Sequence, residues 1–260
     1  MSVKGGAVDL GLRGMKAVLC GASKGLGRAT AEALASEGCD IAICARDRTA
    51  LDVAVSAIAS KGVNAIGETV DVANGQALQD WIVGAAEELG GCDIFISFTS
   101  GGGGPATEET WKANFELDLL ANWRGVSAVM PYLKRSNAGS IVAISTTAAF
   151  EEFFGPQPYN AMKAALINYA AALSQQLAPY GIRVNTVSPG PILIEGGSWE
   201  KIKDNNRDLF DQIVSRIPTG RLGSADEVAR AIAFIASPAC PFLVGANVVI
   251  DGAFTKRVQY

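Results

Sequence analysis

Short apolar runs alternate with longer stretches of helical periodicity along nearly the whole chain. The runs are apolar throughout instead of alternating with polar residues, which is typical of strands buried on both faces of a parallel sheet. They predict seven strands, over Met15–Cys20, Asp40–Cys44, Asn64–Val70, Asp93–Ser97, Ser140–Ser145, Ile182–Val187 and Asn247–Ile250.

The helical stretches fall between these strands and predict helices over Leu26–Glu37, Ala50–Ser60, Ala77–Leu89, Phe115–Lys134, Pro158–Leu177 and Ala225–Ala236. This alternation indicates an α/β protein. Right-handed crossovers then give a doubly wound, seven-stranded parallel sheet with helices on both faces, which is a Rossmann fold. No linker or solenoid-type repeat interrupts the pattern. We therefore expect a single domain over residues 14–260, preceded by a glycine-rich extension over residues 1–13.

The composition excludes several classes of function. The chain has 260 residues, of which 49% are hydrophobic and 18% charged, so a large core can form. The net charge of −4, without a basic stripe, argues against nucleic acid as a partner. We find no apolar run of membrane-spanning length and no signal peptide, and so expect no membrane partner and a cytoplasmic location. Histidine is absent, which removes Ser-His-Asp hydrolysis and the usual metal sites, and we expect no metal.

A glycine-rich turn joins the first predicted strand to the first predicted helix. Gly21 permits a tight turn, Gly25 lets the backbone approach a pyrophosphate, and Gly27 lets the helix pack close to the sheet. The exposed amides and the positive end of the helix then face the phosphates. The expected contacts in this turn are Gly21, Ser23, Lys24, Gly25, Leu26 and Gly27. An ordinary strand–helix turn would also use glycines for packing, but the flanking strand and helix favour a dinucleotide.

The end of the second strand indicates which dinucleotide binds. An acidic residue there would accept hydrogen bonds from the ribose 2′-hydroxyl of NAD, but this strand ends in Arg46. Arg46 could pair with a 2′-phosphate with help from Lys24, so NADP(H) is favoured over NAD(H). Both could instead be solvated surface charges. Asp71, after the third strand, could hydrogen-bond the adenine amine.

Tyr159 and Lys163 lie four residues apart on a predicted helix and so share one face. An ammonium beside a phenol stabilises the phenolate, so we expect Lys163 to lower the pKa of Tyr159 and to make it a general acid and base. A Tyr-x-x-x-Lys pair alone is weak evidence for catalysis, because many such pairs lie on solvated helices. Together with the glycine turn it indicates hydride transfer at a carbonyl or an alcohol.

The order and spacing of several motifs resemble the short-chain dehydrogenase/reductase family, in particular proteins described as 3-oxoacyl carrier-protein reductase-like. The resemblance covers about residues 11 to 254. Its pieces are GASKGLG (21–27), DV (71–72), YNAMK (159–163), IRVNTVSPG (182–190), RLGSADEVA (221–229) and VGANVVIDGA (244–253).

The resemblance implies an oxidoreductase in which hydride passes between the nicotinamide and the substrate carbon. Tyr159 would give or take the proton, and Lys163 would also hold the nicotinamide ribose. The family's serine falls on Thr146, with Ser145 and Thr147 as alternatives, and the family's asparagine falls on Asp118, where a carboxylate could raise the pKa of nearby groups. The implied cofactor contacts also include Val72 beside Asp71, and Pro189, Gly190 and Ile192.

The sequence departs from the family in the loop after the fourth strand. The usual Asn-Asn-Ala-Gly is replaced by Ser97-Phe98-Thr99-Ser100 and four glycines, Gly101–Gly104, which leaves cofactor contacts to Ser97 and Thr99. Ile194 replaces a threonine that would hydrogen-bond the nicotinamide amide. These changes leave two hypotheses open. One is an NADP(H)-dependent reductase or dehydrogenase of a ketone or secondary alcohol, and the other is a catalytically impaired NADP(H)-binding sensor or scaffold.

The stretch of about residues 191–219 is expected to form an insertion over the substrate, with Gly196-Gly197 as a hinge and Trp199, Ile202, Leu209 and Phe210 as an apolar lid. The same residues could instead be core of an amphipathic helix pair. Aromatic residues near Tyr159, namely Phe98, Phe150, Phe153 and Phe154, suggest a hydrophobic small-molecule carbonyl or alcohol that is aromatic or cyclic. The apolar helices near 115–134 and 158–177 predict a homotetramer or homodimer.

Overall fold

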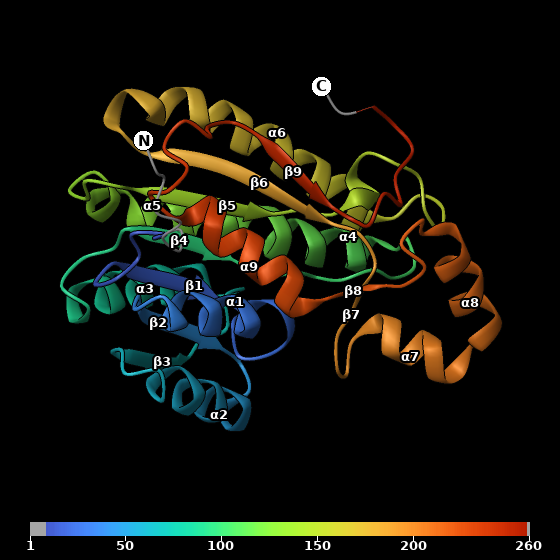
Figure 1. Ribbon diagram of the computed structural model, residues 1–260, viewed down its shortest axis with the longest axis horizontal. Helices are drawn as coiled ribbons and strands as arrows, with labels where there is room; N and C mark the ends of the chain where they lie inside the picture. The colour runs from blue at the N-terminus through green and yellow to red at the C-terminus, as the bar shows by residue number, and fades with distance from the viewer. Residues whose placement is uncertain (1–8, 259–260) are drawn as a thin grey trace, which may run out of the picture.

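Seven parallel strands form one twisted sheet in the centre of the computed structural model, which describes residues 9–258 (Figure 1). Their order is β3-β2-β1-β4-β5-β6-β9, so the strand order reverses between β1 and β4. The doubly wound fold predicted from the sequence is confirmed. The strands are β1 (Lys16–Cys20), β2 (Asp40–Ala45), β3 (Ala65–Thr69), β4 (Ile94–Ser97), β5 (Ser140–Ile144), β6 (Arg183–Pro189) and β9 (Asn247–Ile250).

Helices cover both faces of this sheet because the strands present apolar side chains on each side. One face packs against α1 (Gly25–Ser36), α2 (Arg48–Ala59) and α9 (Ala225–Ala236). The other packs against α3 (Gly75–Glu88), α5 (Ala121–Leu133) and α6 (Pro158–Leu177). Within the described residues, no helix is both long enough and apolar enough to cross a bilayer.

The helix predicted over Phe115–Lys134 is interrupted, which corrects the sequence expectation. A short helix, α4 (Glu108–Asn114), runs into a π-helical segment (Phe115–Leu120) before α5 begins. The Thr99 hydroxyl donates to the Leu117 carbonyl in this segment at 2.9 Å. Such π-helical insertions often lie at functional sites, and this one carries Asp118.

The predicted insertion over residues 191–219 contains α7 (Ser198–Asn205) and α8 (Arg207–Arg216), which lie beyond the sheet in Figure 1. A small sheet of β7 (Ile192–Leu193) and β8 (Gly223–Ser224), which the sequence did not predict, connects this region to the main fold. Residues 1–8 of the predicted N-terminal extension lie outside the described residues. Leu12, from its remainder, is buried in the core.

Candidate active site

The glycine-rich turn follows β1 at the point where the strand order reverses, which is where open α/β sheets bind ligands. Gly21 and Gly25 have φ of +70° and +55°, a conformation that favours glycine. At Gly27 a Cβ would lie 2.6 Å from the Gly21 carbonyl oxygen, so the packing of α1 requires a glycine there. The side chain of Ile194 lies against Gly25, where an added Cβ would be 3.1 Å from its Cγ2.

A cavity of about 590 Å³ opens beside this turn. Its size and its glycine cradle fit a dinucleotide. The predicted contacts Gly21, Ser23, Lys24, Arg46, Val72 and Thr99 line it, together with Ala45, Asp47, Val70, Phe98, Ser100 and Leu117. Phe98 therefore belongs to this cavity and not to the aromatic group expected around Tyr159.

Ser97 and Asp71 are among the predicted contacts that lie outside this lining, and Lys24, which lines the cavity, is already ion-paired. Ser97 is buried and its hydroxyl lies 2.9 Å from that of Thr99, so it supports the cavity wall from behind. Asp71 is exposed and accepts from the Ala73 amide at 3.1 Å, and it is absent from the lining while its two neighbours are present. Lys24 is ion-paired with Asp47 at 2.6 Å, an exposed contact at the cavity rim.

Tyr159, on α6, and Thr146, after β5, line a second cavity of about 440 Å³. Burial, and to a smaller extent the nearby Asp118 carboxylate, raise the pKa of Tyr159 to about 12, while the hydroxyl of Thr146 acts in the opposite direction. This corrects the expectation that Lys163 lowers the pKa of Tyr159. The Lys163 ammonium lies 5.8 Å from the centre of the tyrosine ring and contacts other groups.

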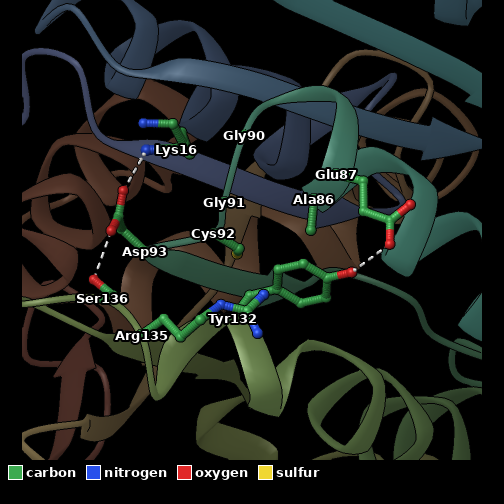
Figure 2. Close-up of a pocket in the computed structure, with 10 residues that line it drawn as sticks. All are labelled: Lys16, Ala86, Glu87, Gly90, Gly91, Cys92, Asp93, Tyr132, Arg135 and Ser136. Carbon is green, nitrogen blue, oxygen red and sulfur yellow. Dashed lines mark hydrogen bonds between the residues drawn. The ribbon is translucent and has the colours of Figure 1, made fainter.

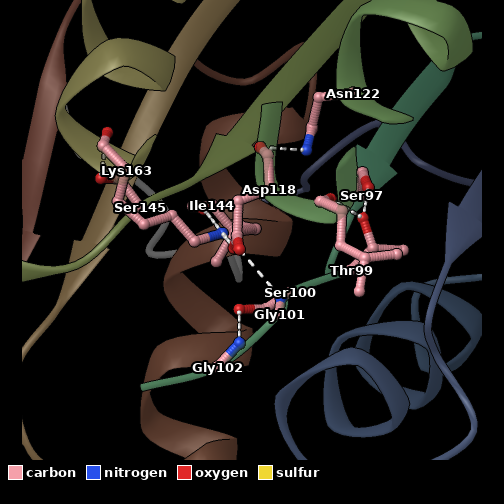
Figure 3. A network of polar contacts seen from close by, with 11 residues as sticks. Ser97, Thr99, Ser100, Gly101, Gly102, Asp118, Asn122, Ile144, Ser145 and Lys163 are labelled. Atoms are coloured by element: carbon pink, nitrogen blue, oxygen red, sulfur yellow. Dashed lines mark hydrogen bonds and ion pairs between the residues drawn. The ribbon is translucent and has the colours of Figure 1, made fainter. Parts of the chain in front are cut away.

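Lys163 is buried, and its ammonium donates to the Ile144 carbonyl at 2.9 Å and pairs with Asp118 at 3.1 Å (Figure 3). Burial lowers the pKa of Lys163, while the Asp118 carboxylate acts to raise it. The structure thus brings together the four predicted catalytic residues, which are Asp118, Thr146, Tyr159 and Lys163. All three candidate hydroxyl residues line the cavity, but Ser145 and Thr147 are only 3% exposed, whereas Thr146 is half-buried. Ser145 instead donates to the Lys163 carbonyl at 3.0 Å.

Pro189, Gly190 and Ile192 line the same cavity, which also borders Leu26 of the glycine turn. Ser100 lines both cavities, so the two form neighbouring parts of one site at the carboxyl edge of the sheet. At Gly190 a Cβ would lie 2.6 Å from the side chain of Asp251, so this position also requires a glycine.

Aromatic side chains from three chain segments surround the cavity beyond Tyr159. Phe153 stacks on Phe254 with ring centres 4.7 Å apart, and Phe154 lies 6.2 Å from Trp199 of α7. All four line the cavity, with Ile202. Leu209 and Phe210 of α8 pack behind them, in the core that the alternative interpretation of this region anticipated.

Phe254 is a lining residue that the sequence interpretation missed. It follows a turn in which Gly252 and Ala253 both have positive φ. The Asp251 carboxylate holds this turn by accepting from the amides of Ala253 and Thr255. The only signal in the sequence is the Asp-Gly pair, which is typical of turns but does not show where the next side chain lies.

A further cavity of about 360 Å³ lies at the opposite, amino-terminal edge of the sheet (Figure 2). Its polar groups pair with one another. Asp93 accepts from the Lys16 amide and the Ser136 hydroxyl, and Tyr132 contacts Glu87 at 3.3 Å. These contacts connect strands and helices, and we assign the cavity no ligand.

Known proteins similar to this chain share its length and fold. Residues 21–255 match a family model described as enoyl-(acyl carrier protein) reductase. The chain is 34% identical to isoepoxydon dehydrogenase from Penicillium expansum, over 96% of this chain and 98% of that protein. It is 32% identical to cyclohexanol dehydrogenase from a Rhodococcus species, over 95% of this chain and 98% of that protein.

Among solved structures, L-sorbose reductase from Gluconobacter frateurii, in complex with NADPH and L-sorbose, superimposes with a TM-score of 0.88. It is 29% identical, and the match covers 96% of this chain and all of that one. The family expected from the motifs is therefore confirmed. The chain belongs to the short-chain dehydrogenase/reductase family, whose members are oxidoreductases of alcohol and carbonyl groups.

Proposed function

We propose that this protein is an NADP(H)-dependent oxidoreductase that interconverts a neutral, largely hydrophobic ketone and its secondary alcohol. The observation that carries the proposal is the position of Tyr159 and Thr146 in an aromatic cavity that adjoins the nucleotide cavity at Ser100. When bound, the nicotinamide supplies or accepts the hydride. Pro189, Gly190 and Ile192 would border its ring, and Lys163 would reach its ribose.

Tyr159 acts on the substrate oxygen. Because its pKa is about 12 in the ligand-free protein, it is protonated at neutral pH and enters the reaction as an acid. It donates its proton to the carbonyl oxygen during reduction and recovers it from solvent afterwards. The Thr146 hydroxyl is placed to hydrogen-bond the same oxygen and so to position the carbonyl. The protonated starting form suits ketone reduction.

The lining of the substrate cavity supports a neutral substrate. Among the described residues that line it there is no Lys, Arg, Asp or Glu, whereas Phe153, Phe154, Trp199 and Phe254 supply flat apolar surfaces. A carboxylate would be desolvated there without a partner. The names of two relatives, cyclohexanol dehydrogenase and isoepoxydon dehydrogenase, are consistent with a ring-containing substrate. The NADPH complex of L-sorbose reductase supports the choice of nucleotide.

The test is to follow NADPH absorbance with cyclic ketones, short charged oxo-acids and 3-oxoacyl thioesters. We expect turnover of the neutral ketones. Y159F should reduce kcat by about 10²–10⁴-fold and leave the NADPH dissociation constant within about twofold. Y180F, at an exposed tyrosine, is the matched control. Turnover of charged oxo-acids alone would refute the substrate class. NADPH binding without turnover of any substrate would instead support the sensor or scaffold hypothesis.

A further inference from the structure

The Asp118 carboxylate is completely buried, and its two oxygens contact two different parts of the molecule (Figure 3). Oδ1 lies 3.1 Å from the Lys163 ammonium, and Oδ2 accepts the Gly101 amide at 2.9 Å. The contact at Oδ2 is a hydrogen bond, and the contact at Oδ1 is an ion pair without a directed hydrogen bond. An amide side chain at this position would carry no negative charge and would present its own NH₂ donor to one of these two partners.

On the lysine side, Asp118 supplies the negative charge that the buried ammonium needs. The Ile144 carbonyl is the other partner of Lys163, and it is uncharged. Removing one member of a buried ion pair leaves an uncompensated charge, which is strongly unfavourable. The position of the ammonium therefore depends on Asp118.

On the loop side, Asp118 holds the glycine-rich loop of residues 99–104 against the π-helical segment. Gly101 approaches closely enough that an added Cβ would lie 3.0 Å from Asn114. The preceding residue, Ser100, lines both the nucleotide cavity and the substrate cavity. Movement of the Gly101 amide would therefore move a wall that the two cavities share.

We propose that Asp118 is a positioning residue that couples the Lys163 ammonium to the glycine-rich loop, so that the proton-transfer site and the wall between the two cavities are held by one carboxylate. The assignment of Tyr159 as the proton-transfer group rests on the proposed function. The coupling itself rests on contacts of the protein alone.

The coupling has an electrostatic consequence at Tyr159. Asp118 is the charged group that acts on this hydroxyl, the Lys163 ammonium lies 5.8 Å from the centre of the tyrosine ring, and the described residues that line the cavity include no charged side chain. Glu151 and Glu152, on the neighbouring loop, accept instead from the amides of Lys256 and Gly155. Because the negative charge of Asp118 raises the pKa of Tyr159, neutralising that charge should lower it.

The test is D118N in the ligand-free protein, with two readouts. Tyrosinate absorbance, taken as the difference from Y159F in the same background, should show the Tyr159 transition about one pH unit lower than in the unaltered protein. Hydrogen exchange at residues 100–102 should become about tenfold faster, because an amide cannot satisfy both partners. D80N removes an equal charge from an exposed site on α3 and should change neither readout.

The coupling requires both changes. If only the titration shifts, or only the loop exchanges faster, Asp118 does not couple the two sites, and if neither changes the carboxylate has no positioning role. If D118N does not fold, amide hydrogen exchange in the unaltered protein provides the test of the Gly101 contact. The Gly101 amide should exchange more slowly than those of Gly103 and Gly104, and equal rates would refute the contact. Lack of turnover would count against the proposed function and would leave these ligand-free measurements valid.

Discussion

Arg46 extends from the end of β2 into the rim of the nucleotide cavity, where it is exposed. We expect R46A to weaken NADPH binding by about tenfold or more, since a hydrogen bond to a charged group contributes about 1.5–3 kcal/mol. NADH lacks the 2′-phosphate, so its binding should be almost unchanged. Fluorescence titration with both nucleotides measures the difference.

R48A is the matched control for this change. Arg48 is also exposed, but it pairs with Asp52 along α2 and does not line the cavity. It should leave both affinities unaltered. If R46A weakens the binding of NADPH and NADH equally, Arg46 does not recognise a 2′-phosphate, and Lys24 would be the remaining cation at this rim.

At the residue scale, the sequence predicts which side chains meet but not their electrostatic relations. Tyr159 and Lys163 were located by their spacing, yet the spacing alone gave the wrong direction for the pKa of Tyr159. Asp118 was predicted to raise the pKa of its neighbours, and it does so at Tyr159. Its contact with Gly101 depends on the path of a glycine-rich loop, which no residue pattern specifies.

At the scale of elements, the C-terminal turn and α7 complete a cavity that begins at α6. Phe254 is 5% exposed and stacks on Phe153 with an angle of 17° between the rings. We expect F254A to lower the free energy of unfolding by about 3 kcal/mol, because it leaves a void in the apolar cluster. It should also raise KM for a cyclic ketone. Urea unfolding and steady-state kinetics measure the two effects.

Phe242 provides the comparison, because its side chain is fully exposed. F242A should change the free energy of unfolding by no more than about 0.5 kcal/mol. If F254A lowers stability but leaves KM unaltered, Phe254 is a core residue only and the proposed wall of the substrate cavity is wrong.

Elements with one strong periodicity were predicted well, and interrupted elements were not. The seven strands and the helices between them follow from continuous apolar runs and from the 3.6-residue pattern. The stretch expected as a helix over Phe115–Lys134 is helical, but its first six residues form a π-helical segment, which the sequence did not predict because such a segment keeps the helical composition while shifting the hydrogen bonds. β7 and β8, each of two residues, are too short to leave any periodicity.

At the scale of the whole molecule, large apolar side chains remain on the surface of α4, the π-helical segment and α5. Trp111, Phe115 and Trp123 are 42%, 47% and 49% exposed. We expect this surface to be covered in a homodimer or homotetramer. Light scattering at micromolar concentration should give a multiple of the 27.0 kDa chain mass, and W123D should reduce it. A monomeric mass for the unaltered protein would contradict this prediction.

Buried acids with raised pKa values make the fold sensitive to alkali. Burial raises the pKa of the Cys39 and Cys92 thiols, a hydrogen bond with Cys44 and burial raise that of Cys20, and burial raises that of Tyr159 to about 12. Above pH 9 the unfolded chain loses these protons first, so the folded state binds more protons and stability falls as the pH rises.

Lys163 acts in the opposite sense, because burial lowers its pKa. The pKa of Tyr159 is raised from 10.0 to about 12, which corresponds to roughly 3 kcal/mol of stability lost between pH 10 and 12. Urea unfolding in the presence of a reductant, at steps from pH 8 to 11, should therefore show a steady fall that begins near pH 9. Y159F should remove the part of the fall above pH 10, whereas Y180F should retain it. A stability that stays constant up to pH 11 would mean that these groups do not remain protonated in the folded protein, and the acid role of Tyr159 would then need a different basis.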